Sequence, residues 1–303
     1  MKRSNSSLEP IQELFREFST LQKFNEIEWV EIDLLDIPSL SVSLQGIKTI
    51  FHTAGCVGFD DREKELIRQI NVEGTENLVN LAISEKIPEF VYISSIAVLD
   101  EVPGERSIDE NSKFDTEKMH SEYAISKKKG EMAVWRGSQE GLKVLVVYPS
   151  VVIGSLDGKR ASEKIFQLAS RKKMFATEGI TGYVDVRDVA FCMAELAGKE
   201  IWNQGFIITS EDKSYTEIFN FLRDKWELDL VKSLSESKLK FIQKISQISR
   251  LFGGPYMSRA SYHALSGKAK YSNRKIKETI SRNFIPVEEA LTFHAEKWRR
   301  LQS

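Results

Sequence analysis

The chain has 303 residues, of which 41% are hydrophobic and 29% are charged, and its formal net charge is −1. These values are usual for a globular protein with a sizeable core, and they give no electrostatic reason to expect a nucleic-acid partner. The two cysteines and four histidines are scattered, so we predict no disulfide framework and no metal site. No apolar run reaches the roughly 18–20 residues that a membrane-spanning helix needs, so we expect a cytoplasmic protein without a stable membrane span.

Short apolar runs alternate with helical patterns in the first half of the chain. Strands are predicted at residues 28–33, 48–53, 89–95 and 142–150, and helices at 8–18, 62–85 and 121–139. Beyond residue 155 the patterns predict a strand turning into a helix at 183–196, a strand at 205–210, and mainly helices from 214 onward, the last near 286–301. The alternation is typical of βαβ crossovers, and the nearly continuous apolar strands indicate burial on both faces. The predicted fold class is α/β, with a Rossmann-like doubly wound parallel sheet that binds its ligand at the carboxyl ends of the strands.

The segment 238–252 needs separate consideration. It carries apolar residues at helical spacing, with four basic residues between them. One interpretation is a helix that binds a membrane surface or a partner. The other interpretation is a surface helix of the C-terminal part with a solvated basic face. This second interpretation is favoured, because amphipathicity of this kind is expected of any surface helix.

Residues 123–131 read YAISKKKGE, and helical spacing places Tyr123 and Lys127 on one face, one turn apart. A lysine ammonium near a phenol favours the phenolate, so Lys127 is expected to lower the pKa of Tyr123 from about 10. A tyrosine of this kind can act as general acid or base toward a hydroxyl or carbonyl oxygen. The same spacing also arises at an ordinary helix start with a solvated lysine. The neighbouring segments are therefore needed to distinguish a reactive pair from an ordinary helix start.

Small and polar residues end the predicted strands around this helix. Ser94 and Ser95 end one strand, where a hydroxyl can bond a substrate oxygen, although serines at such positions also cap turns. FHTAG (51–55) ends an earlier strand with residues small enough for a flat ligand to approach the backbone. Pro-Ser at 149–150 ends a third strand at the same edge. The order and spacing of these segments indicate one ligand site rather than separate turns.

With these segments in place, the sequence resembles the extended short-chain dehydrogenase/reductase superfamily, the group of sugar-nucleotide epimerases, dihydroflavonol reductases and 3β-hydroxysteroid dehydrogenases. The matching motifs are EIDLLD (31–36), IFHTAG (50–55), INVEGTENLV (70–79), VYISSIAV (91–98), YAISK (123–127), YPSVVIG (148–154) and YVDVRDVA (183–190). The resemblance spans roughly residues 1–300 and is weakest after residue 210. It implies a dinucleotide-binding domain in 1–155 and about 183–212, and a smaller, mainly helical substrate-binding domain in about 156–182 and 213–303.

The resemblance also implies a role for each matching residue. Tyr123 matches the family's acid/base, Lys127 the lysine that binds the nicotinamide ribose and tunes the tyrosine, and Ser95 the serine that polarises the substrate oxygen. The implied cofactor-binding residues are Arg3, Asp33, Leu34, Thr53, Ala54, Gly55, Tyr123, Lys127, Pro149 and Ser150, with Asp33 and Leu34 at the adenine ring, Thr53 to Gly55 along the ribose and phosphates, and Pro149 and Ser150 near the nicotinamide. Asn71 matches a helix position of partly structural role, and Asp188 is interpreted as a structural cap or tether.

One family feature has no counterpart here. None of the 17 glycines forms the GxxGxxG or GxGxxG turn that holds the pyrophosphate at a helix N-terminus. On the resemblance, about 30 residues precede Met1 in the family, by the minimum size of a βαβ unit, as in a truncated gene product or a misassigned start. We therefore expect weak dinucleotide binding and exposed apolar faces and unpaired backbone groups on neighbouring strands. Arg3, with Lys2, lies where a basic residue holds the 2′-phosphate, which indicates NADP rather than NAD.

The leading hypothesis is an NAD(P)-dependent oxidoreductase that passes hydride between nicotinamide and a carbonyl or secondary alcohol of a small molecule. A sugar-nucleotide-type epimerase or dehydratase could use the same site, but an exchangeable NADPH, which Arg3 indicates, favours the reductase. A non-catalytic homologue with a binding or regulatory role is favoured by the missing phosphate turn and opposed by the Tyr, Lys and Ser set. No motif defines the substrate, although Lys159 and Arg160 are expected near the pocket mouth. A homodimer through helices 62–85 and 121–139 is a family-level expectation.

Overall fold

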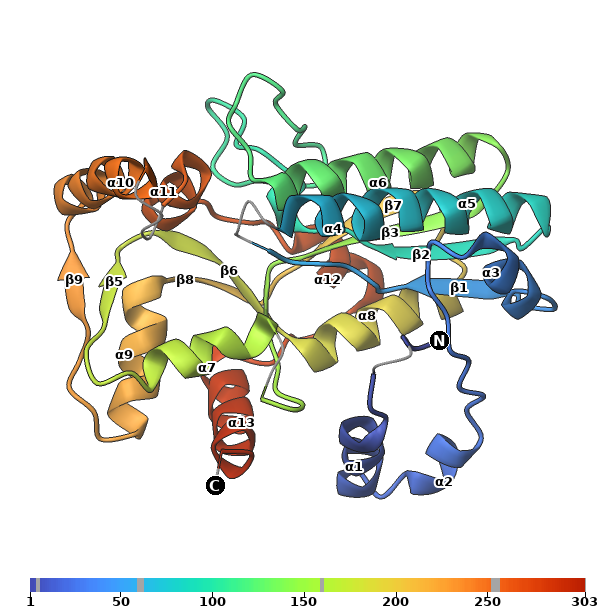
Figure 1. Cartoon of the computed structure of the whole chain (residues 1–303), viewed down its shortest axis with the longest axis horizontal. Helices are drawn as coiled ribbons and strands as arrows, with labels where there is room; N and C mark the ends of the chain where they lie inside the picture. Colours follow the sequence, from blue (N-terminus) through green and yellow to red (C-terminus); the bar gives the residue numbers. More distant parts are fainter. Residues whose placement is uncertain (4–5, 59–62, 159–160, 252–256, 303) are drawn as a thin grey trace.

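A four-stranded parallel sheet forms the centre of the protein (Figure 1). In spatial order its strands are β1 (Thr49–His52), β2 (Glu89–Ile93), β3 (Lys143–Pro149) and β7 (Gln204–Ile208). Thr49 pairs with Glu89, which pairs with Lys143, so the strands run in phase and their carboxyl ends share one edge. The computed structural model describes residues 1–3, 6–58, 63–158, 161–251 and 257–302, with the side chains of residues 161, 247–251 and 260 excepted.

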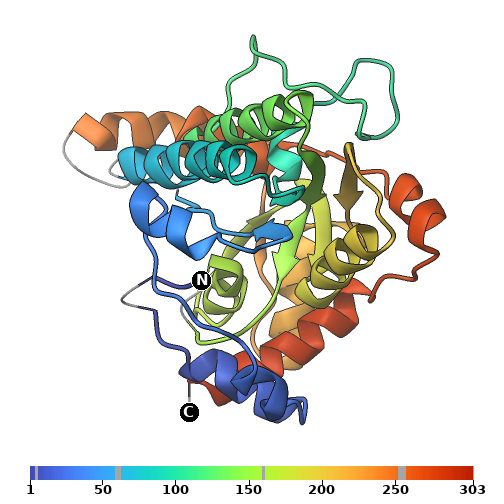
Figure 2. The same cartoon turned by 90° about the vertical axis from the view of Figure 1, so that its right-hand side faces the viewer.

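Helices cover both faces of this sheet, as Figures 1 and 2 show. The core on one face contains residues of α3 (Ile37–Ser43), α5 (Gly74–Ser84) and α6 (Glu122–Gln139), and the core on the other contains residues of α8 (Val186–Gly198) and α12 (Arg274–Ile280). Along β3, Val144 and Val146 belong to the first core, whereas Leu145 and Val147 belong to the second. Burying one such side chain contributes about 1.5–3 kcal/mol, which explains why the strands are apolar without interruption. The predicted doubly wound α/β fold is confirmed.

The remaining elements follow the predicted order closely. They are α1 (Glu9–Glu17), α2 (Leu21–Asn25), α4 (Lys64–Arg68), a π-helical turn η2 (Gln69–Glu73), a 3₁₀ turn η3 (Ile96–Val98), β4 (Val151–Ile153), a 3₁₀ turn η4 (Ala161–Glu163), α7 (Lys164–Ala169), β5 (Phe175–Thr177), β6 (Ile180–Asp185), β8 (Glu211–Ser214), α9 (Tyr215–Lys225), β9 (Lys232–Leu234), α10 (Glu236–Leu251), α11 (Arg259–Ser266) and α13 (Val287–Arg300). The predicted helix 62–85 is therefore built from α4, η2 and α5, and the predicted strand–helix unit at 183–196 from β6 and α8.

The predicted strand at 28–33 is wrong. Within the described residues, this segment makes only an isolated bridge between Glu31 and Lys2. A strand is stabilised by a neighbour that pairs its N–H and C=O groups, and residues 1–3 provide one short contact. β1 lies at the edge of the four-stranded sheet, and its Phe51 is 46% exposed, as expected for an incompletely covered apolar face.

A second group of elements stands at one end of the sheet. It contains the three-stranded sheet β4-β6-β8, the pair β5-β9, and the helices α7, α9 and α13. Its core includes Phe166, Tyr183, Leu222, Leu291 and Trp298. These two small sheets are not predicted from the sequence, whereas the helices after residue 214 are. The proposed division into two domains stays a prediction.

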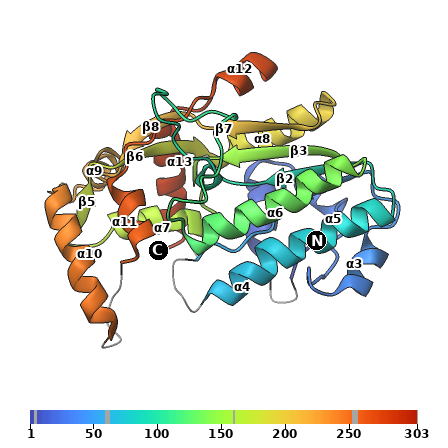
Figure 3. The same ribbon diagram turned by 90° about the horizontal axis from the view of Figure 1, so that it is seen from above.

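Helices α10 and α11 form the outer end of this second group, where Figure 3 shows them beyond α7. The two helices pack against each other. No helix in the described ranges combines the length and apolarity that crossing a bilayer requires.

Candidate active site

Lys127 of α6 reaches the carboxyl edge of the sheet. Its buried ammonium donates a hydrogen bond of 2.5 Å to the backbone oxygen of Ile93, the last residue of β2. The same ammonium lies 4.3 Å from the centre of the Tyr92 ring. A Cβ atom placed on Gly55 would lie 3.9 Å from it, so the chain leaving β1 also passes beside Lys127. Lys127 therefore stands where the ends of two strands meet α6.

Tyr123 and Ser95 lie next to this point. Ser121 caps α6 by accepting a bond of 3.1 Å from the backbone N–H of Ala124, which sets Tyr123 in the first turn. Ser95 directly follows β2, and its hydroxyl lies close to the Tyr123 phenol. The Ser95 hydroxyl also accepts a bond of 3.2 Å from the N–H of Ala97. The structure thus brings the three predicted catalytic residues to one place, and their catalytic roles stay predictions.

Burial dominates the pKa values of this group. Burial raises the pKa of Tyr123 above its usual value, and the nearby Ser95 hydroxyl opposes this shift only in part. Burial also lowers the pKa of Lys127 to about 7, against the opposing effect of the Glu131 charge. The prediction that Lys127 lowers the pKa of Tyr123 is therefore wrong in this structure, because removing the phenol from water outweighs any attraction from the lysine.

Glu131 is a buried carboxylate one turn beyond Lys127, with only 2% of the residue exposed. It accepts hydrogen bonds from Ser94 at 2.7 Å, Lys128 at 3.0 Å, and Trp135 and Tyr148 at 3.3 Å each. Because Ser94 follows β2 and Tyr148 belongs to β3, this carboxylate joins two strand ends to α6. The sequence analysis missed Glu131, although its place at i+8 from Tyr123 and i+4 from Lys127 continues the same helix face.

The hydrogen bonds of Glu131 also distinguish the roles of the two adjacent serines, Ser94 and Ser95. Ser94 is 2% exposed and donates its hydroxyl hydrogen to Glu131. Ser95 is partly exposed and faces Tyr123. Of the pair, Ser95 is therefore the serine whose hydroxyl can meet a substrate.

Asn71 lies in the π-helical turn η2, a type of turn that is frequent at functional sites. Its amide oxygen accepts a bond of 2.7 Å from the N–H of Cys56, and its amide nitrogen donates to the Cys56 carbonyl at 2.9 Å. The same nitrogen donates to the hydroxyl of Ser126 at 2.9 Å. Asn71 therefore ties the segment after β1 to α6, beside Lys127.

Replacing Asn71 with Ala is expected to lower the free energy of unfolding by about 2 kcal/mol, because it leaves buried polar partners without their hydrogen bonds. Urea denaturation measures this loss. Asn111→Ala is the matched control, since Asn111 is exposed and, among the described residues, its side chain bonds Asp109 alone. A loss no larger than that of the control would contradict the role of Asn71 as a tie between segments.

The residues predicted along the ribose and phosphates of the cofactor, and those predicted near its nicotinamide, lie at the same edge of the sheet. Thr53, Ala54 and Gly55 directly follow β1 and are exposed. Pro149 ends β3, and Ser150 follows it with 5% exposure. The Ser150 hydroxyl has no hydrogen-bond partner in the part of the chain that the structure describes. A buried hydroxyl of this kind leaves a donor and an acceptor for a bound ligand.

The residues predicted near the adenosine are more open. The exposed Asp33 carboxylate accepts a hydrogen bond of 2.9 Å from the N–H of Leu35. Leu34 packs closely against Gly74 of α5, since a Cβ atom added to Gly74 would lie only 2.9 Å from the Leu34 side chain. Arg3 is exposed, and its charge acts on the thiol of Cys56 just beyond β1. The residues present therefore fit the nicotinamide half of a dinucleotide better than its phosphates, for which the sequence has no glycine-rich turn. Lys159 and Arg160 lie outside the described residues.

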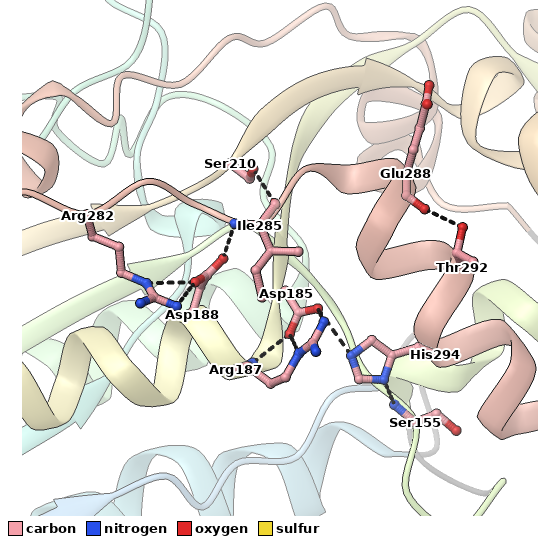
Figure 4. Close-up of polar contacts among 10 residues, drawn as sticks. All are labelled: Ser155, Asp185, Arg187, Asp188, Ser210, Arg282, Ile285, Glu288, Thr292 and His294. Atoms are coloured by element: carbon pink, nitrogen blue, oxygen red, sulfur yellow. Dashed lines mark hydrogen bonds and ion pairs between the residues drawn. The ribbon is translucent and has the colours of Figure 1, made fainter.

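A second buried polar cluster joins the C-terminal segment to β6 and α8 (Figure 4). Asp188 is fully buried and accepts bonds from Arg282 at 2.6 and 2.8 Å and from the N–H of Ile285 at 2.7 Å. Asp185 caps α8 and lies 3.3 Å from the imidazole of His294 on α13. These contacts confirm the interpretation of Asp188 as a structural tether.

Replacing Asp188 with Ala is expected to cost about 3 kcal/mol of unfolding free energy, because it leaves the half-buried Arg282 charge and the N–H of Ile285 without their buried carboxylate. Chemical denaturation followed by circular dichroism measures the change. Glu278→Ala removes an exposed ion pair to Arg274, with side chains 70% and 84% exposed, and is expected to cost less than about 1 kcal/mol. Equal losses in the two variants would contradict the tether.

Comparison with known proteins gives consistent results for this fold and site. Residues 11–189 match the model of the 3-beta hydroxysteroid dehydrogenase/isomerase family. The chain is 31% identical over 169 residues to cinnamoyl-CoA reductase 1 of Petunia hybrida, which covers 52% of this chain and 50% of that one. It is 27% identical over 211 residues to tetraketide alpha-pyrone reductase 1 of Arabidopsis thaliana, which covers 65% and 64%. The chain spans about half the length of the curated relatives that it matches first.

A solved structure supports the fold alone. The crystal structure of a nucleoside-diphosphate-sugar epimerase from Pseudomonas aeruginosa is similar, with a TM-score of 0.75 over 99% of this chain and 88% of that one. The identity between the two is 14%, which is too low to transfer an activity.

Proposed function

Because the chain belongs to the 3-beta hydroxysteroid dehydrogenase/isomerase family, we propose that it is an NAD(P)-dependent oxidoreductase acting on a carbonyl or secondary alcohol of a small molecule. The observation that carries this proposal is that Ser95, at the end of β2, and Tyr123, in the first turn of α6, lie close together beside the buried Lys127. A hydroxyl and a phenol at one point can bond the same substrate oxygen, and the phenol can exchange a proton with it.

NADP or NAD, when bound, supplies or accepts the hydride. Lys127, Ser150 and the backbone at Gly55 are the residues that would hold its nicotinamide half, and Arg3 favours NADP at the other end. Ser95 orients the substrate oxygen and withdraws electron density from it through a hydrogen bond. Tyr123 holds the proton at its phenolic oxygen and donates it to a carbonyl oxygen, or takes it back from an alcohol.

The protonated form of Tyr123 is consistent with the reductive direction. A phenol whose pKa is raised by burial stays protonated at neutral pH, which is the form that donates a proton to a carbonyl. The names of the two curated relatives also support a reductase, at 31% and 27% identity. An epimerase or dehydratase has only a likeness of fold in its favour.

The proposal is tested first by ligand binding. Saturation-transfer NMR detects weak complexes, which suits a chain without a glycine-rich turn. We expect transfer from the protein to the nicotinamide protons of NADPH, and loss of this transfer in Lys127→Met. Absence of transfer to the nicotinamide in the unmodified chain would contradict the proposed site.

Turnover gives the second test. We expect the absorbance of NADPH to fall when cinnamoyl-CoA or a panel of aldehydes and ketones is added, with formation of the corresponding alcohol or, from a thioester, the aldehyde. Conversion of a sugar nucleotide without net consumption of NADPH would instead support an epimerase.

A further inference from the structure

Helix α10 is the outermost element of the C-terminal part, with α11 between it and the central sheet (Figures 1 and 3). One side of α10 faces the protein. Leu239 and Gln243, one turn apart, are 2% and 7% exposed. Ser246 lies about one turn beyond Gln243 on the same side of the helix. Its hydroxyl accepts a hydrogen bond of 3.0 Å from the N–H of Met257, just before α11. These contacts define the inner side of the helix.

The outer side of α10 is apolar. Phe241 is 64% exposed, Ile242 is 40% exposed and Ile245 is 49% exposed. At about 100° per residue, these three side chains span roughly 100° of the helix surface beside the inner side, with Phe241 farthest from the inner side and Ile242 bordering it. A single exposed apolar residue is common on protein surfaces, whereas a contiguous exposed apolar face indicates a binding surface.

Lysines surround this apolar face. Lys238 lies on the face itself, Lys244 borders it and Lys240 lies further round, and all three are exposed. Residues 237–246 contain these three lysines and no acidic residue, whereas the whole chain has a net charge of −1. The nearest acidic side chain, Glu236, accepts a bond from Tyr262 of α11 at 3.3 Å and so lies on the inner side. The outer side therefore combines apolar and purely cationic groups.

We propose that this outer side of α10, formed by Lys238, Phe241, Ile242, Lys244 and Ile245, binds the surface of a membrane that contains anionic lipid. Aromatic and aliphatic side chains of an interfacial helix enter the boundary between headgroups and acyl chains, while lysine ammonium groups remain among the lipid phosphates. The charge of the helix is complementary to such a surface, whereas an apolar protein partner would not need the lysines. The helix would lie in the membrane plane.

This proposal decides between the two sequence-based interpretations of segment 238–252. A helix with a solvated basic face would turn its apolar residues toward the protein. Here the structure turns Leu239 inward and leaves Phe241, Ile242 and Ile245 outside. The proposal does not rest on the oxidoreductase activity, because Ser95, Tyr123 and Lys127 lie on other elements.

The test is co-sedimentation of the full chain with vesicles of phosphatidylcholine alone and of phosphatidylcholine mixed with phosphatidylserine. We expect binding to the mixed vesicles and weaker binding to the neutral ones. The variant Phe241→Ser/Ile245→Ser and the variant Lys238→Gln/Lys240→Gln/Lys244→Gln are each expected to weaken binding about tenfold or more, since each lysine near the surface contributes roughly fivefold.

Two variants provide matched controls. Val42→Ser removes an exposed apolar side chain on α3, where Val42 is 69% exposed, and Lys277→Gln removes an exposed lysine on α12. Both are expected to bind like the unmodified chain. Far-ultraviolet circular dichroism confirms that each variant is folded.

Three results would overturn the proposal. The first is failure of the unmodified chain to sediment with the mixed vesicles. The second is binding of the α10 variants that equals binding of the controls. The third is a chain that binds no vesicle but is dimeric by light scattering and becomes monomeric in Phe241→Ser/Ile245→Ser, which would identify a second copy of the chain as the occupant.

Discussion

Replacing Tyr123 with Phe is expected to lower the turnover of NADPH at least 100-fold while leaving NADPH binding nearly unchanged. The substitution removes one oxygen atom from the first turn of α6, where the phenol meets Ser95. Proton transfer by a positioned side chain contributes about 10²–10⁴-fold to a rate, so the loss should fall in this range. Steady-state consumption of NADPH and saturation-transfer NMR measure the two effects on the same protein.

Two further variants make this result specific. Tyr262→Phe removes a phenol from α11 and should leave turnover unchanged. Ser95→Ala should also lower turnover, and the double variant with Tyr123→Phe should lose little more than the worse single variant, because residues that act as a unit are not additive. Turnover that persists in Tyr123→Phe would refute the assignment of Tyr123 as the proton donor.

The central sheet could be predicted because each of its strands leaves a strong local signal. β2 and β3 are buried on both faces, so the sequence must be apolar at every position of 89–93 and 143–149 except near the ends. Residues 28–33 carry a similar pattern but do not form a strand, because pairing depends on a neighbour elsewhere in the chain. The strands β4, β5 and β9, with three residues each, are too short to show a period.

The sequence predicts that Tyr123, Lys127 and Ser95 lie together, but it does not predict the electrostatics around them. Tyr123 and Lys127 share a helix face by spacing alone, and Ser95 follows from the end of a strand. The direction of the pKa shifts depends on how completely the phenol and the ammonium are removed from water, which no local pattern reveals. Glu131 resembles an ordinary surface glutamate of a helix until the bonds from Ser94 and Tyr148 are known.

The second large effect is expected at Lys127, because the folded protein buries this amine among groups that carry little charge. Its neighbours include the Tyr92 ring and His52. Burial and the charge of Lys127 together lower the pKa of His52 to about 3. Glu131 is the nearby anion that opposes the shift. The folded pKa of about 7 lies below the unfolded value of 10.5, so the unfolded chain binds more protons between these pH values. The free energy of unfolding therefore rises with pH across this window.

Lys127→Met should remove this dependence. At pH 7 the free energy of unfolding of the variant is expected to be higher than that of the unmodified chain by on the order of 4 kcal/mol, because the variant buries no amine. The lost hydrogen bond to Ile93 reduces this gain. At pH 9 the gain should be smaller by about 2 kcal/mol. Urea denaturation of both proteins between pH 7 and 9 measures the difference. The pH range of the experiment ends at 9 because Cys56 and the buried tyrosines titrate above it. Their pKa values are raised in the folded protein, so their titration lowers the free energy of unfolding as the pH rises.

Lys129→Met, which changes an exposed lysine of the same helix, is the matched control and should follow the unmodified chain at every pH. A difference between Lys127→Met and the unmodified chain that does not vary with pH would mean that Glu131 keeps Lys127 protonated throughout this range. The site would then present a permanent cation beside Tyr123. In that case the lysine, rather than burial, would set the proton affinity of the tyrosine during turnover, and the pH profile of the reaction would follow Tyr123 alone.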